Sequence, residues 1–169
     1  HSAWIRWIQK ASKNQEMLGQ NVNLEDFLFE SKRSNLQIFV PVLKEEQKNN
    51  CFYCDQPMKD TVEVDHFIPW SRYAIDLGHN FVLAHKKCNA EKSDFLASER
   101  YLEKWVERNQ ISGDMLEDYF DDNNLVHNVK TSMSVSKWAY QQCSESSGLV
   151  WAGYKGGFSD LSERWNGFF

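Results

Sequence analysis

Three features are missing from the sequence, and each absence excludes a class of protein. No window approaches the roughly 18 uninterrupted apolar residues of a transmembrane helix. No charged start followed by an apolar run and a small-residue cleavage site is present, so secretion is not signalled. No internal repeat or low-complexity linker divides the 169 residues. We therefore expect one soluble domain, or one domain with an appendage.

The sequence also lacks a basic excess. It carries 19 Lys and Arg residues against 24 Asp and Glu residues, which gives a net charge of −5. Proteins that wrap nucleic acid usually carry a surplus of positive charge. The balance therefore argues against a large phosphate-binding surface, although it is compatible with a compact site that uses a few cations.

Aromatic residues, by contrast, are plentiful. There are 11 Phe, 7 Trp and 6 Tyr, or 14% of the chain, which is enough bulk for a packed core. The chain begins with His1 rather than Met, and the segment Trp4-Ile5-Arg6-Trp7-Ile8 is typical of a helix interior. We therefore expect a fragment or a processed product that continues from a missing upstream region.

Local patterns predict an α+β fold that is mostly helical, with a small β-containing insert in the middle. Apolar spacing predicts helices over 3–18 and 23–29, and another over 36–46 that breaks or starts near Pro41. Strands are predicted at 62–64 and 149–151, and helices occupy most of the chain after residue 90. The predicted organisation is a helical N-terminal segment (1–50), a central module (51–95) and a helical C-terminal region packed on that module (96–169).

The cysteines are spaced for a metal rather than for disulfides. Cys51 and Cys54 form one pair with two residues between them, and His85 and Cys88 form a second. Two such pairs make a tetrahedral Cys₃His site for a structural zinc ion. The alternative is a chance cysteine pair beside a core histidine. Cys143 is left over and is expected to be a small buried residue on a helix. With no secretion signal, we expect a cytoplasmic protein.

The segment between the two pairs contains a second group of polar residues. Asp65 and His66 are adjacent at the end of the predicted strand, Asn80 precedes Phe81-Val82-Leu83, and Asn89 follows Cys88 in Cys-Asn-Ala-Glu-Lys. In this order and framed by the two pairs, these elements resemble the HNH endonuclease family over residues 51–94. The resemblance implies a ββα-metal fold. More loosely, residues 41–80 are similar to a bacterial group of HNH proteins that carries a further N-terminal region.

The resemblance also implies a role for each of these residues. His66 would be the general base, and Asn80 would orient His66 or pin its loop. The third motif position is Asn89 instead of His, which makes this an H-N-N variant. Asp65 and Asn89 would hold the catalytic divalent ion, and two oxygen ligands suit Mg²⁺ or Mn²⁺ better than a second zinc.

Phosphodiester hydrolysis needs these residue types for physical reasons. A neutral histidine can take a proton from water near neutral pH, and a divalent ion compensates the charge on the phosphoryl oxygens. Neighbouring residues on a regular strand point oppositely, so a bend or bulge is needed for Asp65 and His66 to face one site. Arg72 and Lys92, with Lys86 and Lys87, are the cations that could hold phosphates.

These observations favour a metal-dependent DNA endonuclease with little base specificity, with RNA as an open alternative substrate. Relatives of this kind act in prokaryotic defence, restriction or guided effector systems. Residues 51–95 carry five basic and seven acidic side chains, so we expect the missing N-terminal region or a partner subunit to deliver the substrate. The competing hypothesis is a non-catalytic zinc module that binds nucleic acid or protein. It explains the zinc ligands but not the group of Asp65, His66, Asn80 and Asn89.

Overall fold

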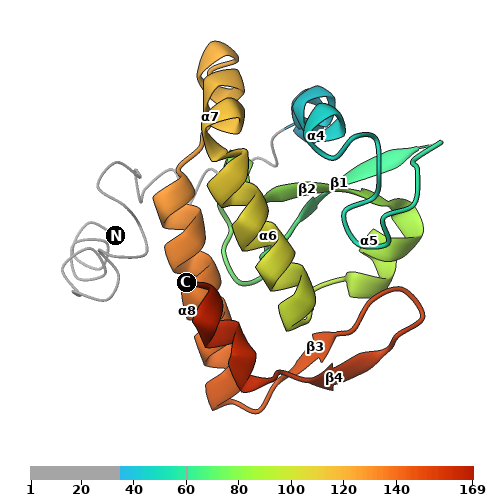
Figure 1. Cartoon of the computed structure of the whole chain (residues 1–169), viewed down its shortest axis with the longest axis vertical. Helices are drawn as coiled ribbons and strands as arrows, with labels where there is room; N and C mark the ends of the chain where they lie inside the picture. Colours follow the sequence, from blue (N-terminus) through green and yellow to red (C-terminus); the bar gives the residue numbers. More distant parts are fainter. Residues whose placement is uncertain (1–34, 60) are drawn as a thin grey trace, which may run out of the picture.

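The computed structural model describes residues 35–59 and 61–169 (Figure 1). The helices predicted over 3–18 and 23–29 lie outside the described residues. The predicted mixture of helices with small sheets is confirmed. The elements follow in the order η1 (Leu36–Phe39), α4 (Val40–Glu46), β1 (Val62–His66), η2 (Gly78–Asn80), β2 (Phe81–His85), α5 (Lys86–Lys92), α6 (Glu99–Ile111), α7 (Gly113–Asp122), α8 (Val129–Glu145), β3 (Leu149–Trp151), β4 (Phe158–Asp160) and η3 (Glu163–Phe168).

The central insert is a ββα unit. β1 and β2 pair antiparallel in a continuous register from Val62 opposite His85 to His66 opposite Phe81. α5 begins directly after β2 and packs on both strands. The run Phe81–Ala84 is apolar and fully buried, as expected for a strand that is covered on both faces. This unit places the end of β1 close to the end of α5, where Lys92 donates to the backbone carbonyl of His66.

The segment before this unit breaks where the sequence predicted. Residues 36–39 form a 3₁₀ turn that is capped by the side chain of Asn35, and α4 follows with Pro41 in its first turn. Proline fits there because the first amides of a helix have no intrahelical acceptor. α4 buries Val42 and Leu43 against the ββα unit.

The helices α6, α7 and α8 lie beside the ββα unit and share one hydrophobic core with it (Figure 1). Trp105 of α6 stacks on Phe67, which follows β1, with ring centroids 5.1 Å apart and planes 8° apart. η2 lies so close to α7 that a Cβ atom at Gly78 would come within 2.6 Å of the Phe120 ring. Glycine is therefore required for this approach, which fixes the turn before β2.

The C-terminal part adds a second small sheet. The strand predicted at 149–151 is confirmed as β3, and it pairs antiparallel with β4, which the sequence did not predict. Trp151 also bridges to Ala97, and its side chain is fully buried. None of the helices within 35–59 and 61–169 is long and apolar enough to cross a membrane.

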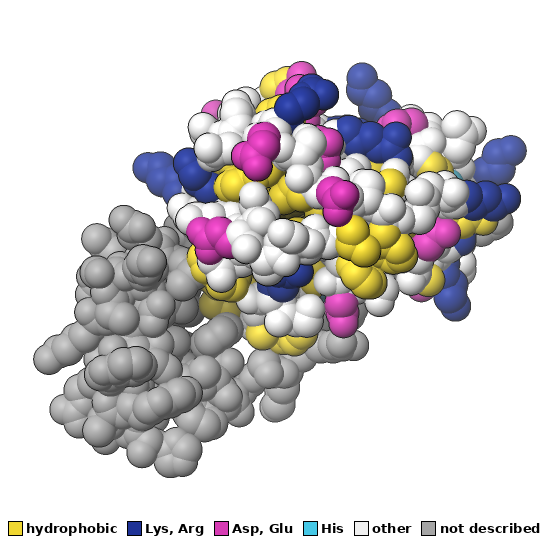
Figure 2. Space-filling model, turned by 90° about the horizontal axis from the view of Figure 1, so that it is seen from below, with side chains coloured by type: hydrophobic (Ala, Val, Ile, Leu, Met, Phe, Trp, Pro, Cys, Tyr) yellow, Lys and Arg dark blue, Asp and Glu magenta, His cyan; other side chains and the backbone are white. Residues whose placement is uncertain are grey.

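Charged side chains of both signs are mixed on the surface. On the face shown in Figure 2, basic side chains are separated by acidic and neutral ones. This agrees with the small net charge of the sequence, and it argues against a broad field for phosphates on this face.

Candidate active site and metal centre

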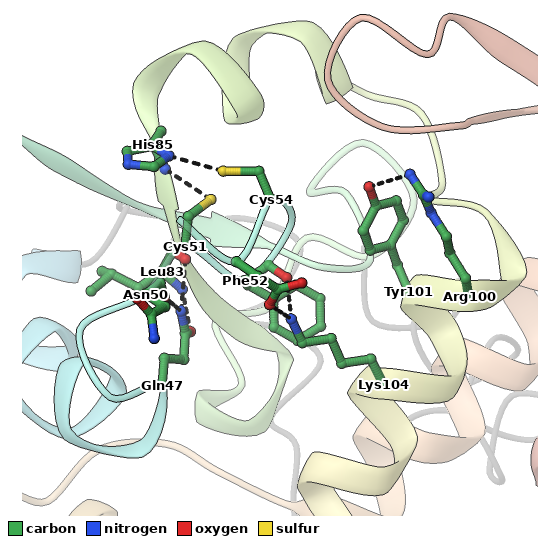
Figure 3. A network of polar contacts seen from close by, with 11 residues as sticks. Gln47, Asn50, Cys51, Phe52, Cys54, Leu83, His85, Arg100, Tyr101 and Lys104 are labelled. Carbon is green, nitrogen blue, oxygen red and sulfur yellow. Dashed lines mark hydrogen bonds and ion pairs between the residues drawn. The ribbon is translucent and has the colours of Figure 1, made fainter. Parts of the chain in front are cut away.

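The four predicted zinc ligands lie together at one end of the β1–β2 ladder. The sulfur atoms of Cys51, Cys54 and Cys88 and a ring nitrogen of His85 all lie within 4.8 Å of one another. The loop before β1 supplies Cys51 and Cys54, and the junction of β2 with α5 supplies His85 and Cys88; Figure 3 shows the first three of these. Thiolate and imidazole donors in this number fit a closed, structural zinc site. Among the described residues this is the only group of this kind.

The ring of His85 is oriented by a contact of its second nitrogen, Nε2. Nδ1 of His85 lies 3.2 Å from the sulfur of Cys54, while Nε2 lies 3.3 Å from the carbonyl oxygen of Pro57. A carbonyl only accepts, so the proton belongs on Nε2 and the lone pair of Nδ1 faces the cluster. Figure 3 shows this ring beside the two sulfur atoms of the loop.

The electrostatics of the cluster call for a cation. Burial raises the pKa of the Cys88 thiol, and the neighbouring Cys51 and Cys54 raise it further. The Cys88 thiol therefore resists ionisation unless a positive charge lies beside it. A divalent ion supplies that charge, and its binding drives out the thiol protons.

Two long side chains from outside hold the loop that carries Cys51 and Cys54. The amide of Gln47, just after α4, accepts from the backbone N–H of Leu83 at 2.7 Å and donates to the Leu83 carbonyl at 2.8 Å. Lys104 of α6 donates to the carbonyl of Phe52 at 2.6 Å and pairs with Asp55 (Figure 3). The metal centre is thus attached to both β2 and α6.

His66 stands at the last position of β1, and its ring is held on three sides. The ring lies against Phe81 and Trp70, with centroids 4.8 Å and 5.4 Å away. Its Nε2 atom lies 2.7 Å from a carboxylate oxygen of Asp76. The side chains of His66 and Asp76 are 16% and 13% exposed, so the pair is only partly shielded from solvent.

Asp65 points to the other side of the strand. The pairing of β1 with β2 is continuous through Asp65 and His66, without the bulge that a shared site was expected to need. One oxygen of Asp65, Oδ2, accepts from the hydroxyl of Tyr53 at 2.5 Å and pairs with the ammonium of Lys92 at 3.0 Å. Burial raises the pKa of Tyr53, and Asp65 raises it further, so Tyr53 keeps its proton as the donor.

Asn80 fastens the chain that follows His66. Its side-chain oxygen accepts from the backbone N–H of Ile68 at 2.8 Å, and its amide donates to the carbonyl of Ile68 at 3.0 Å. The backbone N–H of Phe67 donates to the carbonyl of Asn80 at 2.9 Å. Asn80 therefore makes a local sheet-like pairing with the residues after His66. Of the two roles expected for Asn80, this geometry corresponds to pinning the loop.

A buried arginine holds the backbone on both sides of Asn80. Arg108 of α6 is 7% exposed, and its guanidinium donates to the carbonyls of His79 at 2.6 Å and Phe81 at 2.9 Å. Burial lowers the pKa of Arg108 to about 10, and Glu46 partly offsets this. The arginine therefore stays charged at neutral pH and fixes the backbone on both sides of Asn80.

The third motif position lies on α5 and faces β1. The amide nitrogen of Asn89 donates to a carboxylate oxygen of Glu63 at 2.8 Å. Glu63 and Asp65 are two residues apart on β1 and therefore share one face of the strand. The carbonyl oxygen of Asn89, Oδ1, has no hydrogen-bond partner among residues 35–59 and 61–169. An acidic face of β1 and the amide oxygen of Asn89 thus come together between β1 and α5.

The expected phosphate contacts have other partners in the structure. Lys92 is 0% exposed, and its ammonium also donates to the backbone carbonyl of His66 at 2.9 Å. Arg72 is partly buried and close to α8, where its charge opposes the effect of burial on the pKa of Cys143. The substrate contacts of Arg72 and Lys92 stay predictions, and as placed here Lys92 ties Asp65 to the end of β1.

Two supporting residues were missed by the sequence reasoning. Asp76 lies ten residues after His66 in an irregular segment, and no periodicity links the two. Arg108 did carry a signal, because it follows Tyr101 by seven residues and so shares its buried helix face. A charged residue on an apolar face indicates a buried interaction.

Comparison with known proteins identifies the segment. Residues 51–98 match a family model described as HNH endonuclease. The match spans both zinc-ligand pairs, β1, β2 and α5, which confirms the family resemblance drawn from the motifs. It indicates a nuclease module that acts on nucleic acid. No curated protein matches the chain, and the likeness to a bacterial group with an added N-terminal region stays a prediction.

Proposed function

We propose, from the HNH endonuclease match at residues 51–98, that this chain is a metal-dependent endonuclease that hydrolyses DNA phosphodiester bonds with little base specificity. The observation that carries the proposal is the setting of His66. It ends β1 of a ββα unit with a Cys₃His cluster at its far end, and its ring is partly open to solvent. In this position His66 acts as the general base that removes a proton from the attacking water.

The residues between β1 and α5 fit a hard divalent ion. Both contacts of Asp65 fall on Oδ2, so Oδ1 has no hydrogen-bond partner within the described part of the chain. Asn89 donates through its nitrogen to Glu63, which leaves its oxygen as the atom that can ligate. We propose that Asp65 and Asn89 hold Mg²⁺ or Mn²⁺. When bound, such an ion supplies charge compensation at the phosphoryl group and at the leaving 3′ oxygen.

The remaining polar groups of the site have positioning roles in this proposal. Lys92 links Asp65 to the backbone of His66. Asn80 pins the chain after His66 through Ile68. Holding the base and the ion-binding carboxylate in fixed relative positions matters because small misplacements slow a reaction of this kind strongly.

The proposal is tested by incubating the zinc-loaded chain with supercoiled plasmid in Mg²⁺, in Mn²⁺ and in EDTA. We expect nicking in either metal and none in EDTA. Single-stranded DNA and RNA of matched length, tested in parallel, separate DNA from RNA as the substrate. Metal-independent nicking, or cleavage confined to RNA, would contradict the proposal as stated.

A second candidate function is a zinc-stabilised module that binds nucleic acid or protein without cleaving. The closed Cys₃His cluster supports a folded module of either kind. The side chains of His66 and Asn80 are both held in place by hydrogen bonds. This favours the nuclease, because binding alone does not require a histidine held in one orientation. A binding module is expected to be indifferent to His66→Ala.

We further propose that this chain is the cutting unit of a larger system, such as a prokaryotic defence, restriction or guided effector complex. The net charge of −5 and the mixed surface charges support delivery of the substrate by another region or subunit. Addition of the delivering part is expected to raise cleavage by this chain without changing its metal requirement.

A further inference from the structure

We propose that Asp76 is a positioning residue that fixes the tautomer and the orientation of His66, so that Nδ1 of His66 is the basic atom. This inference rests on the proposed function for its catalytic meaning. Its structural content does not, because it concerns only which nitrogen of His66 carries the proton.

The proton assignment follows from the chemistry of the two groups. Nε2 of His66 lies 2.7 Å from Oδ1 of Asp76, which is hydrogen-bond distance. An ionised carboxylate only accepts hydrogen bonds, so Nε2 must be the donor and must carry the proton. A neutral imidazole has one proton on its two nitrogens. The lone pair is therefore on Nδ1, for which no hydrogen-bond partner exists within residues 35–59 and 61–169.

The packing of the ring leaves Nδ1 as the atom that can reach water. Phe81 and Trp70 contact the ring edge-on, and Asp76 covers the Nε2 side. His66 remains partly exposed despite these contacts. Both described hydrogen bonds of the Asn80 side chain go to Ile68. The orienting group of the base is therefore Asp76 and not the second residue of the motif.

Asp76 also stabilises the product of the proton transfer. When Nδ1 accepts a proton, the ring becomes an imidazolium, and its positive charge forms an ion pair with the nearby carboxylate. Loss of Asp76 is therefore expected to lower kcat by about tenfold to a hundredfold, taking as a guide the losses caused by removing the hydrogen-bond partner of a metal-ligating histidine. KM should change little, because neither His66 nor Asp76 is needed to bind the substrate in the ground state.

The direct test is nitrogen NMR of the chain labelled at its histidine rings, recorded on the zinc-loaded protein at about pH 8.5, where ordinary imidazoles are neutral. The chain has only five histidines, and His66→Gln assigns the signals of His66. We expect the wild type to show His66 protonated at Nε2 alone. In Asp76→Ala, the same signals should move toward an average of both tautomers.

The structure offers a matched control. His127 and Asp121 form a similar pair, with Nε2 and the carboxylate oxygen 2.9 Å apart. Asp121→Ala should shift the signals of His127 and leave those of His66 unchanged. Asp76→Leu, which removes the acceptor but keeps a side chain of similar size, serves if Asp76→Ala loses zinc or folded structure.

Two results would overturn the inference. One is a wild-type His66 protonated at Nδ1, and the other is a His66 spectrum that is unchanged in a folded, zinc-loaded variant without the acceptor, Asp76→Ala or Asp76→Leu. Cleavage kinetics add a second readout, in which Asp76→Glu should recover part of the kcat lost in Asp76→Ala. If the wild type cleaves no nucleic acid, the proposed function fails, while the NMR result still decides the role of Asp76.

Discussion

At the scale of single residues, the site depends on buried polar groups whose partners are all backbone or carboxylate. Asn80, Arg108 and Lys92 each lie in the interior, and each donates to a carbonyl of a segment that carries a functional side chain. Burial makes such groups costly when they lose a partner. Their removal should therefore affect stability as well as the site.

Asn80→Ala should destabilise the fold by about 2 to 4 kcal/mol. The substitution removes two hydrogen bonds and leaves the buried N–H and C=O of Ile68 without partners. Urea unfolding of the zinc-loaded chain measures this. The matched control is Asn123→Ala, since Asn123 is exposed and donates only to the carbonyl of Tyr119, with an expected change within about 0.5 kcal/mol. Equal losses in the two variants would contradict the role given to Asn80.

Burial of His79 is expected to make the folded chain less stable in acid. Burial lowers the pKa of His79 from 6.5 to about 4, although its hydrogen bond to the carbonyl of Gly113 raises it somewhat. Below pH 6.5 His79 is protonated in the unfolded chain, whereas in the folded chain it is protonated only near pH 4 and below. The stability from neutral His79 is complete above this window and falls as the pH falls through it, by about 3 kcal/mol in all.

The matching measurement is the free energy of unfolding against pH for the wild type and for His79→Gln. The acid sensitivity of the zinc ligands is common to both proteins and cancels in the difference. The wild-type curve should fall more steeply between neutral pH and about pH 4. Parallel curves would show that His79 does not resist protonation in the folded chain.

At the scale of elements, the Cys₃His cluster with zinc bound would replace much of the core that a short ββα unit lacks. It joins the loop at 51–54 to the junction of β2 and α5. Structural zinc contributes on the order of 10 kcal/mol to segments of this kind. The sequence predicted that these four residues cluster, because ligand spacing is a local signal. It could not predict that Gln47 and Lys104 would hold the loop, because these contacts join residues 36 and 52 positions apart.

Cys51→Ser should loosen the whole ββα unit, whereas Cys143→Ser should not. Cys51 is a ligand of the cluster, while Cys143 is buried on α8 and outside it. The measurement is amide hydrogen exchange of β1 and β2 together with zinc content. We expect one zinc per chain in the wild type and in Cys143→Ser, and lost protection with lost zinc in Cys51→Ser. Retained strand protection in zinc-free Cys51→Ser would contradict a structural role for the metal.

The same contrast between local and distant signals explains which residues of the site the sequence could indicate. His66, Asn80 and Asn89 could be singled out as candidates because each lies in a short motif next to a zinc-ligand candidate or a strand, and their roles stay predictions. The pairing of His66 with Asp76 crosses an irregular segment, which has no periodicity to read. Adjacent strand residues were expected to need a bulge to share one site, and instead β1 runs regularly and sends Asp65 toward Lys92 and His66 toward Asp76. The regular alternation of the strand places the two side chains on opposite faces, and their partners hold them there.

At the scale of the whole molecule, the charge of the chain sets a limit on how it meets nucleic acid. Its net charge is −5, and Lys92 is fully buried in an ion pair with Asp65. Duplex binding strength depends mainly on the number of phosphates that cations neutralise. The chain alone should therefore be a poor duplex binder even if it is a competent cutting unit.

The Kd of the isolated chain for duplex DNA should be above about 10 µM at physiological salt, and it should depend only weakly on salt concentration. Fluorescence anisotropy with a labelled duplex of random sequence measures both quantities on the zinc-loaded chain without added Mg²⁺ or Mn²⁺, where cleavage is not expected. Tight binding with a steep salt dependence would contradict the view that another region or subunit delivers the substrate.

The measurement that tests the central claim most directly compares His66→Ala with His127→Ala in the plasmid-nicking assay. Both proteins should keep one zinc and the wild-type fold, because neither histidine is a ligand of the Cys₃His cluster. If His66 is the general base, His66→Ala should lose nicking by about a hundredfold or more, while His127→Ala nicks plasmid like the wild type. Equal nicking by the zinc-loaded His66→Ala protein and the wild type would contradict the account.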